Sequence, residues 1–242
     1  IITLLLFLPC FSLLLTSNTV SAEGLFVDPI IPHGETVTYN AIDGDKCYSV
    51  VEHVTVKNDG ERKVYEIISL SDSIDRKLVL DKETMAIVSV HTIRKYPEVT
   101  LDSKLKVKDE KPLLDGDEFK LADFAVMTYV FRGFPFTKLD KLKIGFYGSE
   151  QKRKFNFRAH YKMTESVTVN NKLIECHRLE FGLDGFWGTF LPKMNVWYSV
   201  DPPHYLVRYK GLVGPPGSPK RDSQLLNYTI SKDALPHPFD NM

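Results

Sequence analysis

From Glu35 onward, apolar and polar residues alternate with a period of two over many short runs. This is the pattern of a β-strand with one face against a core and the other face in water. The segment 99–108 is a clear example, because polar residues separate its apolar ones. We expect four of its side chains to face the core, namely Val99, Leu101, Leu105 and Val107.

Turn-forming residues separate these runs and predict antiparallel hairpins. Three pairs of runs are expected to form such hairpins: 48–56 with 63–70, 76–80 with 85–94, and 194–200 with 205–209. The sequences between the paired runs are Asn58-Asp59-Gly60, Asp81-Lys82-Glu83 and Asp201-Pro202-Pro203-His204. Closely spaced strands joined by such turns imply an antiparallel meander.

One segment has helical periodicity. Asp117 is a candidate N-cap, and Gly133 and Pro135 are candidate stop signals. The residues between them recur at spacings of three and four, as Leu121, Phe124, Ala125, Thr128, Tyr129 and Phe131. The patterns together predict a mainly β fold, of the β-rich α+β class. In that fold a curved antiparallel meander sheet or half-barrel carries one covering helix.

The segment 152–163 alternates most regularly. Its inward face is predicted to carry Phe155, Phe157, Ala159, Tyr161 and Met163. Three cations lie on the outward face with no acidic residue between them, namely Lys154, Arg158 and Lys162. Such a row suits contact with anionic lipid headgroups or a polyanionic envelope polymer. The other interpretation is a solvated face whose charge is balanced by Glu175 and Glu180 of the next hairpin.

Aromatic residues make up 12% of the chain, and many fall on predicted inward positions. If the sheet encloses an apolar cavity, four of them are candidates for lining it: Phe155, Phe157, Tyr161 and Trp197. A hydrophobic or lipid ligand would be the expected occupant. The competing interpretation is that these rings fill a solid core, which would leave no room for a ligand.

The N-terminal segment predicts export. Residues Ile1 to Leu15 are almost wholly apolar, and Val20-Ser21-Ala22 follows as a small-residue cleavage site. We expect a signal peptide at 1–22, cleaved after Ala22, and one exported β-rich domain at 23–242 in the bacterial periplasm. After Ala22 no apolar run approaches the roughly 20 residues of a membrane-spanning helix. The balance of 31 basic and 31 acidic residues argues against nucleic-acid binding.

Catalytic signatures are weak. Ser199, Asp201 and His204 lie close together in one turn region, where three side chains seldom point at a common centre, and no Gly-x-Ser-x-Gly elbow is present. The histidines lack metal-ligand spacing. We therefore expect no catalytic residue, metal or cofactor. Cys47 and Cys176 are open to two interpretations, a disulfide or two free thiols.

Three segments carry a resemblance to a known family: DFAVMTYVFRGFPF at 123–136, Cys176 to Phe181, and Leu191 to Arg221. The pattern of Arg132 at the end of a helix and of Trp197 and Asp201 in a final hairpin resembles the exported bacterial domain-of-unknown-function family 3108. That resemblance implies a secreted, mostly antiparallel β protein and no established reaction. In outline the expected architecture is also similar to the curved sheets of periplasmic lipoprotein carriers.

Two functions remain open from the sequence. The first is a non-catalytic periplasmic protein that binds or carries a hydrophobic or lipid ligand in the curved sheet. The second is an envelope assembly or interaction protein that docks a partner protein. For the second, the contacts would come from the basic strand face and from the proline-rich loop 214–221.

Overall fold

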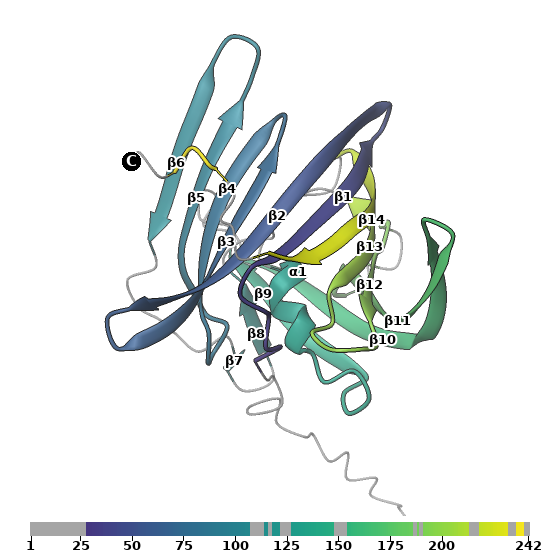
Figure 1. Cartoon of the computed structure of the whole chain (residues 1–242). Helices are drawn as coiled ribbons and strands as arrows, with labels where there is room; N and C mark the ends of the chain where they lie inside the picture. Colours follow the sequence, from purple (N-terminus) through teal and green to yellow (C-terminus); the bar gives the residue numbers. More distant parts are fainter. Residues whose placement is uncertain are drawn as a thin grey trace, which may run out of the picture.

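The computed structural model describes residues 28–106, 114–115, 118–121, 127–147, 154–185, 188, 191–212, 218–231 and 236–239. In this part of the chain the strands form one sheet in the order β6-β5-β4-β3-β2-β1-β14-β13-β12-β11-β10-β9-β8-β7. The sheet is strongly curved, with β1 and β14 near its middle (Figure 1). The predicted signal peptide and its cleavage site lie outside the described residues.

All strand pairs are antiparallel except β8 with β9, which is parallel. The strands of the first half are β1 (Glu35–Asp43), β2 (Lys46–Asp59), β3 (Arg62–Ser71), β4 (Ile74–Asp81), β5 (Ile87–Lys95), β6 (Thr100–Lys106), β7 (Leu114–Asp115) and β8 (Glu118–Leu121). Those of the second half are β9 (Lys141–Tyr147), β10 (Lys154–Val169), β11 (Lys172–Leu183), β12 (Met194–Ser199), β13 (Leu206–Leu212) and β14 (Lys220–Ile230). The three predicted hairpins, β2–β3, β4–β5 and β12–β13, are confirmed.

The expected helix exists but is much shorter than predicted. Only α1 (Met127–Val130) and the 3-10 turn η2 (Phe131–Gly133) are helical. Residues 118–121, expected to begin the helix, form strand β8 instead, because they pair in parallel with β9. The expected N-cap Asp117 and the positions Phe124 and Ala125 lie outside the described residues. A helix of one turn is stabilised by its tertiary packing, since so short a helix is unstable alone.

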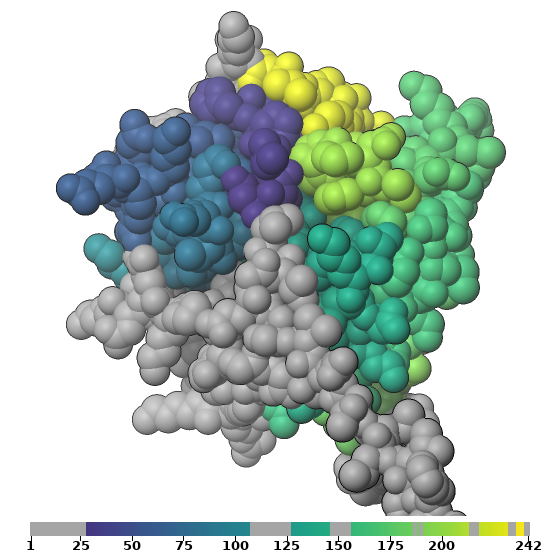
Figure 2. Space-filling model, turned by 90° about the horizontal axis from the view of Figure 1, so that it is seen from below, coloured from purple at the N-terminus to yellow at the C-terminus, as the bar shows by residue number. Residues whose placement is uncertain are grey.

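The segment from Met127 to Phe136 covers the concave face of the sheet. The Phe131 ring meets the edge of the Phe181 ring at a centroid distance of 4.9 Å, and the Phe136 ring lies 5.8 Å from that of Tyr198. Both Phe131 and Tyr198 are fully buried. Figure 2 shows β1 between the earlier strands in blue and the C-terminal strands in yellow-green, with part of 127–147 in teal beside them. The middle of the concave face is therefore filled by side chains of this segment.

Three positions that alternation predicted to be buried are exposed, for two different reasons. Val99 precedes the edge strand β6 and Leu101 lies in it, beyond the margin of the core, and they are 51% and 48% exposed. Leu105, nearer the core, packs against it, whereas Val107 lies outside the described residues. Met163 is 46% exposed because the pairing of β10 with β11 shifts between Tyr161 and Met163. A bulge of this kind reverses which alternate positions face inward.

Candidate functional site

The register shows which face each predicted ligand-binding residue occupies. Phe157 lies opposite Leu183 and Tyr161 opposite Leu179, and both rings are half-buried against the main core on the concave face. Trp197 lies opposite Arg178, the neighbour of Leu179, and so occupies the other face. The backbone of Phe155 pairs with Phe146, but its side chain lies outside the described residues. The structure therefore places Phe157 and Tyr161 on one face and separates Trp197 from them.

Trp197 belongs to a polar network on the convex face. Its Nε1 donates a hydrogen bond to Glu165 Oε1 at 2.7 Å, and the Arg208 guanidinium lies 5.7 Å from the ring centroid. Glu165 also pairs with Arg178 at 3.1 Å, and Arg208 with Asp222 at 2.6 Å. These contacts account for the Trp197 side chain without a ligand.

On the concave face Phe136 gathers a cluster of aromatic rings. It stacks on His177 at a centroid distance of 4.4 Å and meets His204 at 5.4 Å and Tyr161 at 6.3 Å. Burial, and then the neighbouring His204, lower the pKa of His177. A lowered pKa keeps the His177 imidazole neutral at neutral pH, so Phe136 and His177 form an uncharged stacked pair.

A buried ion pair attaches the covering segment to the sheet. Arg132 is 2% exposed, and its Nη1 and Nη2 donate to Glu35 Oε1 and Oε2 at 2.6 and 2.8 Å. Its Nε donates to the Pro203 carbonyl at 3.0 Å. Burial opposes the charge on Arg132, but the hydrogen bonds and charge of Glu35 raise its pKa overall. The sequence pattern singled out Arg132 but gave no signal for Glu35, which is 97 residues away.

Beside this pair lies a second acid, the partly buried Glu52. Tyr129 Oη donates to Glu52 Oε2 at 2.6 Å, and Tyr228 Oη donates to Glu35 Oε2 at 3.2 Å. Burial raises the pKa of Glu52, and hydrogen bonds from Tyr129 and Ser69 oppose that effect. These contacts engage both carboxylates and both tyrosine hydroxyls, so the cluster fixes the cover on the sheet.

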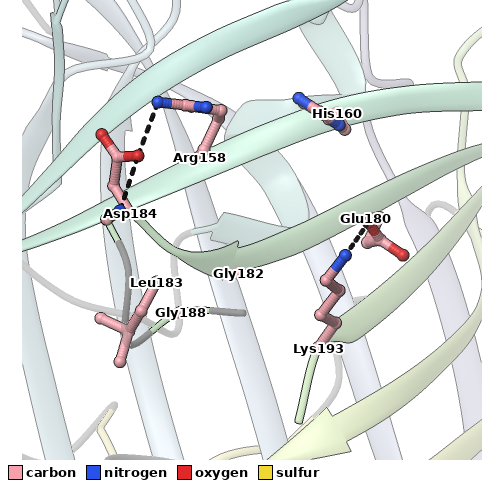
Figure 3. A pocket seen from close by; sticks show the side chains of 9 residues that line it. Arg158, His160, Glu180, Gly182, Leu183, Asp184, Gly188 and Lys193 are labelled. Atoms are coloured by element: carbon pink, nitrogen blue, oxygen red, sulfur yellow. Dashed lines mark hydrogen bonds and ion pairs between the residues drawn. The ribbon is translucent and has the colours of Figure 1, made fainter. Parts of the chain in front are cut away.

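The convex face carries a hollow of about 420 Å³ between the β10–β11 pair and the segment that follows β11. Its lining is formed by Arg158, His160, Glu180, Gly182, Leu183, Asp184, Gly185, Gly188 and Lys193. Arg158 and His160 come from β10, opposite Gly182 and Glu180 of β11. In Figure 3 two ion pairs lie on either side of Gly182, which has no side chain to fill the space.

The charges around the hollow are predominantly positive. Arg158 Nη2 pairs with Asp184 Oδ1 at 2.6 Å, and Lys193 Nζ pairs with Glu180 Oε1 at 3.0 Å. Lys162 Nζ also approaches Glu180, at 3.6 Å. Glu180 thus neighbours two cations, so three positive side chains face two carboxylates. All three cations are partly exposed, with 33 to 48% of each side chain accessible.

Burial and the surplus of positive charge around the hollow both lower the pKa of His160. Burial lowers its pKa most, and Lys141, Lys162 and Arg158 lower it further, against a smaller opposite effect of Glu180. A histidine whose pKa is lowered by cations lies in a positive potential. The imidazole is therefore neutral at neutral pH, and its Nε2 is a buried atom without a hydrogen-bond partner within the described part of the chain.

Three residues were predicted to contact anions. Arg158 lines the hollow, and Lys162 lies at its border, where it approaches Glu180. The side chain of Lys154 lies outside the described residues. Sequence alternation identified this face, but it gave no signal for Lys193, which joins the hollow from a separate segment. Within the proline-rich loop 214–221, residues 214–217 lie outside the described residues, and Arg221 at its end pairs with Asp43.

The turn between β12 and β13 has the geometry of a structural turn. Ser199 Oγ donates to the Asp201 carbonyl at 2.8 Å, and His204 Nδ1 lies 2.8 Å from the Ser199 carbonyl. Both side chains are thus engaged with backbone, and the serine hydroxyl is not joined to the imidazole by any described hydrogen bond. Across the described ranges no cluster of three His, Cys, Asp or Glu side chains has the geometry of a metal site.

The described helices include none that is long and apolar enough to cross a membrane. Cys47 and Cys176 are both free thiols, so the structure contains no disulfide between them.

Comparison by sequence finds no matching family model and no matching curated protein. The resemblance to family 3108 therefore stays a prediction. Solved structures with a similar fold include a β-barrel-like protein of domain of unknown function DUF1849 from Brucella abortus. It is 8% identical with a TM-score of 0.46, and the match covers 82% of this chain and 98% of that one.

Two further structures are similar to this chain. The hypothetical lipoprotein YmcC from Escherichia coli is 10% identical with a TM-score of 0.34, covering 81% of this chain and 88% of that one. The LolA superfamily protein NE2245 from Nitrosomonas europaea is 11% identical with a TM-score of 0.31, covering 90% and 96%. At these values the matches carry no conclusion about function, and the site itself must support any proposal.

Proposed function

We propose that the protein is an exported, non-catalytic binding protein whose convex hollow binds the phosphate of a phosphate ester. The observation that supports this is the charge around the hollow, where Arg158 and Lys193 of the lining and Lys162 at its border outnumber Glu180 and Asp184. Arginine matches the geometry of a phosphate through two parallel hydrogen bonds, and lysine adds a point charge. Gly182 leaves the space that the group would occupy.

The ion pairs do not prevent such binding. Pairs at this level of exposure contribute little stability, so an incoming phosphate can replace a carboxylate as the partner of Arg158 or Lys193 at small cost. The predicted contact residues Lys154, Arg158 and Lys162 lie along β10, so the strand would extend the positive surface beyond the hollow. Binding should weaken as salt concentration rises.

The test is binding to vesicles of phosphatidylcholine with and without phosphatidylglycerol, with calorimetric titration of free glycerol phosphate as a second arm. If the phosphate belongs to a lipid headgroup, we expect binding only to vesicles that contain phosphatidylglycerol. If it belongs to a free ester, we expect heat of binding on titration with glycerol phosphate. The double change Arg158→Gln and Lys193→Gln should weaken binding about tenfold, because each partly exposed charge contact is worth up to about 1 kcal/mol and about 1.4 kcal/mol is a factor of ten.

The matched control is Lys46→Gln with Lys172→Gln, which removes two exposed cations from other parts of the sheet. Gly182→Leu, which fills the hollow without changing any charge, should also abolish binding. The proposal is wrong if the control weakens binding as much as the hollow variant does, or if neither arm detects binding by the wild type.

A second candidate function is binding of a hydrophobic ligand on the concave face. Phe157 and Tyr161 support it, because both are half-buried there against the main core, and Tyr161 lies beside the neutral pair of Phe136 and His177. The segment from Met127 to Phe136 fills the middle of this face, so a ligand would occupy its margin or displace part of that segment.

Native mass spectrometry with lipid extraction, on protein purified without detergent, tests this second candidate. A co-purifying apolar molecule is the expected result, and Phe157→Ser should release it. Trp197→Ser is the matched control, since Trp197 lies on the opposite face and its loss should leave the ligand bound. Equal release by both variants, or a clean apo mass for the wild type, would contradict a concave-face ligand.

A further inference from the structure

Strand β6 forms one edge of the sheet. It pairs with β5 on one side, and within the described residues no strand pairs with its other side. Figure 1 shows it at the outer margin of the curved sheet. Six of its seven residues are exposed, and Tyr96 and Val99 just before it are each 51% exposed. An exposed edge with apolar side chains is a template for pairing with another strand.

The sequence of β6, Thr-Leu-Asp-Ser-Lys-Leu-Lys, is complementary to itself in the antiparallel direction. Pairing centred on Ser103 puts Leu101 opposite Leu105 of the second strand and Asp102 opposite its Lys104. Each of these contacts occurs twice, because a two-fold axis relates the strands. From this complementarity we infer that β6 is the interface of a homodimer, in which the edge strands of two copies pair and join their sheets.

The faces of the strand agree with this arrangement. Leu101 and Leu105 share the concave face, since they lie opposite Arg94 and Val90 of β5. Asp102 and Lys104 share the convex face, opposite Ile93 and His91. Residues directly opposite one another in a sheet point to the same side. The two leucines of each copy therefore meet, and so do the two opposite charges.

Other registers are disfavoured by the same residues. A shift of two residues in one direction puts Asp102 opposite the second Asp102. A shift in the other direction puts Lys104 opposite the second Lys104. Like charges directly opposite are destabilising, so of these three registers only the one centred on Ser103 puts Asp102 opposite Lys104 and no like charges opposite each other. Asp102 already pairs with His91 Nε2 at 2.7 Å, but its side chain is 45% exposed and has further acceptor capacity.

The sequence of β6 is complementary to itself, so a second copy of this chain fits the edge better than a different protein does. In the dimer the exposed Leu101 side chain is covered and the edge of the sheet is removed. The two concave faces become one continuous surface, while the convex hollows at β10 and β11 stay remote from the interface. The inference is thus independent of the ligand that either face binds.

The test is a charge swap followed by sedimentation velocity. The wild type should sediment as a dimer at micromolar concentration, and Asp102→Lys or Lys104→Asp alone should give monomers, because each puts like charges opposite one another. The double change Asp102→Lys with Lys104→Asp should restore the dimer. The charge change Asp72→Lys, in an exposed turn, is the control and should leave the dimer intact. Unchanged melting temperatures would show that the monomeric variants remain folded.

Crosslinking gives a second, independent readout. In a Cys47→Ser background, Ser103→Cys places a thiol opposite its own copy, at the Cα separation of about 4.5–5.5 Å that suits a disulfide. We expect a crosslinked dimer on mild oxidation for Ser103→Cys and none for Thr100→Cys, which lies opposite Lys106. A monomeric wild type, a double swap that stays monomeric, or equal crosslinking at both positions would overturn the inference.

Discussion

At the scale of single residues, the two cysteines in the described part of the chain have opposite environments. Cys47 is exposed and its Sγ donates to Asn40 Oδ1 at 3.1 Å. Cys176 is completely buried, and burial raises its pKa to about 12. Since the thiolate is the reactive species, position in the fold decides which thiol reacts.

We predict that a disulfide reagent such as DTNB modifies Cys47 in the native protein and leaves Cys176 unmodified. In urea both thiols should react. Peptide mass spectrometry after alkylation identifies the sites, and the variant Cys47→Ser, with no native reactivity, is the control. If neither thiol reacted in urea without reducing agent, Cys47 and Cys176 would be joined by a disulfide, and the prediction of two free thiols would be wrong.

At the scale of elements, the β10–β11 hairpin is the longest in the sheet, and its tip reaches across to β14. Asn170 Nδ2 donates to the Leu226 carbonyl at 2.7 Å. Asn170 and Asn171, the turn residues, have φ values of 49° and 62°. Both are in the left-handed region, which asparagine tolerates and most other side chains do not.

We predict that Asn171→Gly changes the free energy of unfolding little, because glycine adopts the left-handed conformation without strain. Asn171→Val should lower it by about 1–2 kcal/mol, since a β-branched side chain clashes there. Urea unfolding measures both. Lys172→Val, at an exposed strand position one residue later, should be nearly neutral, and equal stability of the two Asn171 variants would count against a left-handed turn.

At the scale of the whole molecule, the buried pair of Arg132 and Glu35 joins the covering segment to the middle of the sheet. Removal of one partner leaves a buried charge uncompensated, and such losses cost about 3–5 kcal/mol. The surface pair of Arg158 and Asp184 has the same chemistry with far greater exposure, and pairs of that kind are worth about 0–1 kcal/mol.

We predict that Arg132→Met lowers the free energy of unfolding by about 3–5 kcal/mol, whereas the control Arg158→Met lowers it by less than about 1 kcal/mol. The double variant Arg132→Met with Glu35→Leu should be more stable than Arg132→Met alone, because no buried charge remains unpaired. Denaturant unfolding of the four proteins measures these differences. If Arg132→Met and Arg158→Met lowered the free energy of unfolding equally, burial would not explain the larger contribution of the Arg132 pair.

Much of the fold was predictable because its signals are local. Alternation placed the strands and turn residues placed the hairpins, since both depend on neighbours within a few positions. The helix was predicted too long, because the pairing of 118–121 with β9 outweighed the helical spacing of that segment. Arg158 and Lys162 of the candidate site were predictable from the basic row, but Lys193 was not, because only the folded chain brings it to Glu180.

The sequence by itself determined the strands, the turns and which residues alternate along each strand, because these are set by backbone geometry and nearby side chains. The tertiary structure decided which alternate position is buried. Curvature and the sheet edge left Leu101 exposed, and a bulge turned Met163 outward. It also decided the pairing of Arg132 with Glu35 and the hollow around Gly182, since both join side chains from strands or segments that meet only when the sheet forms.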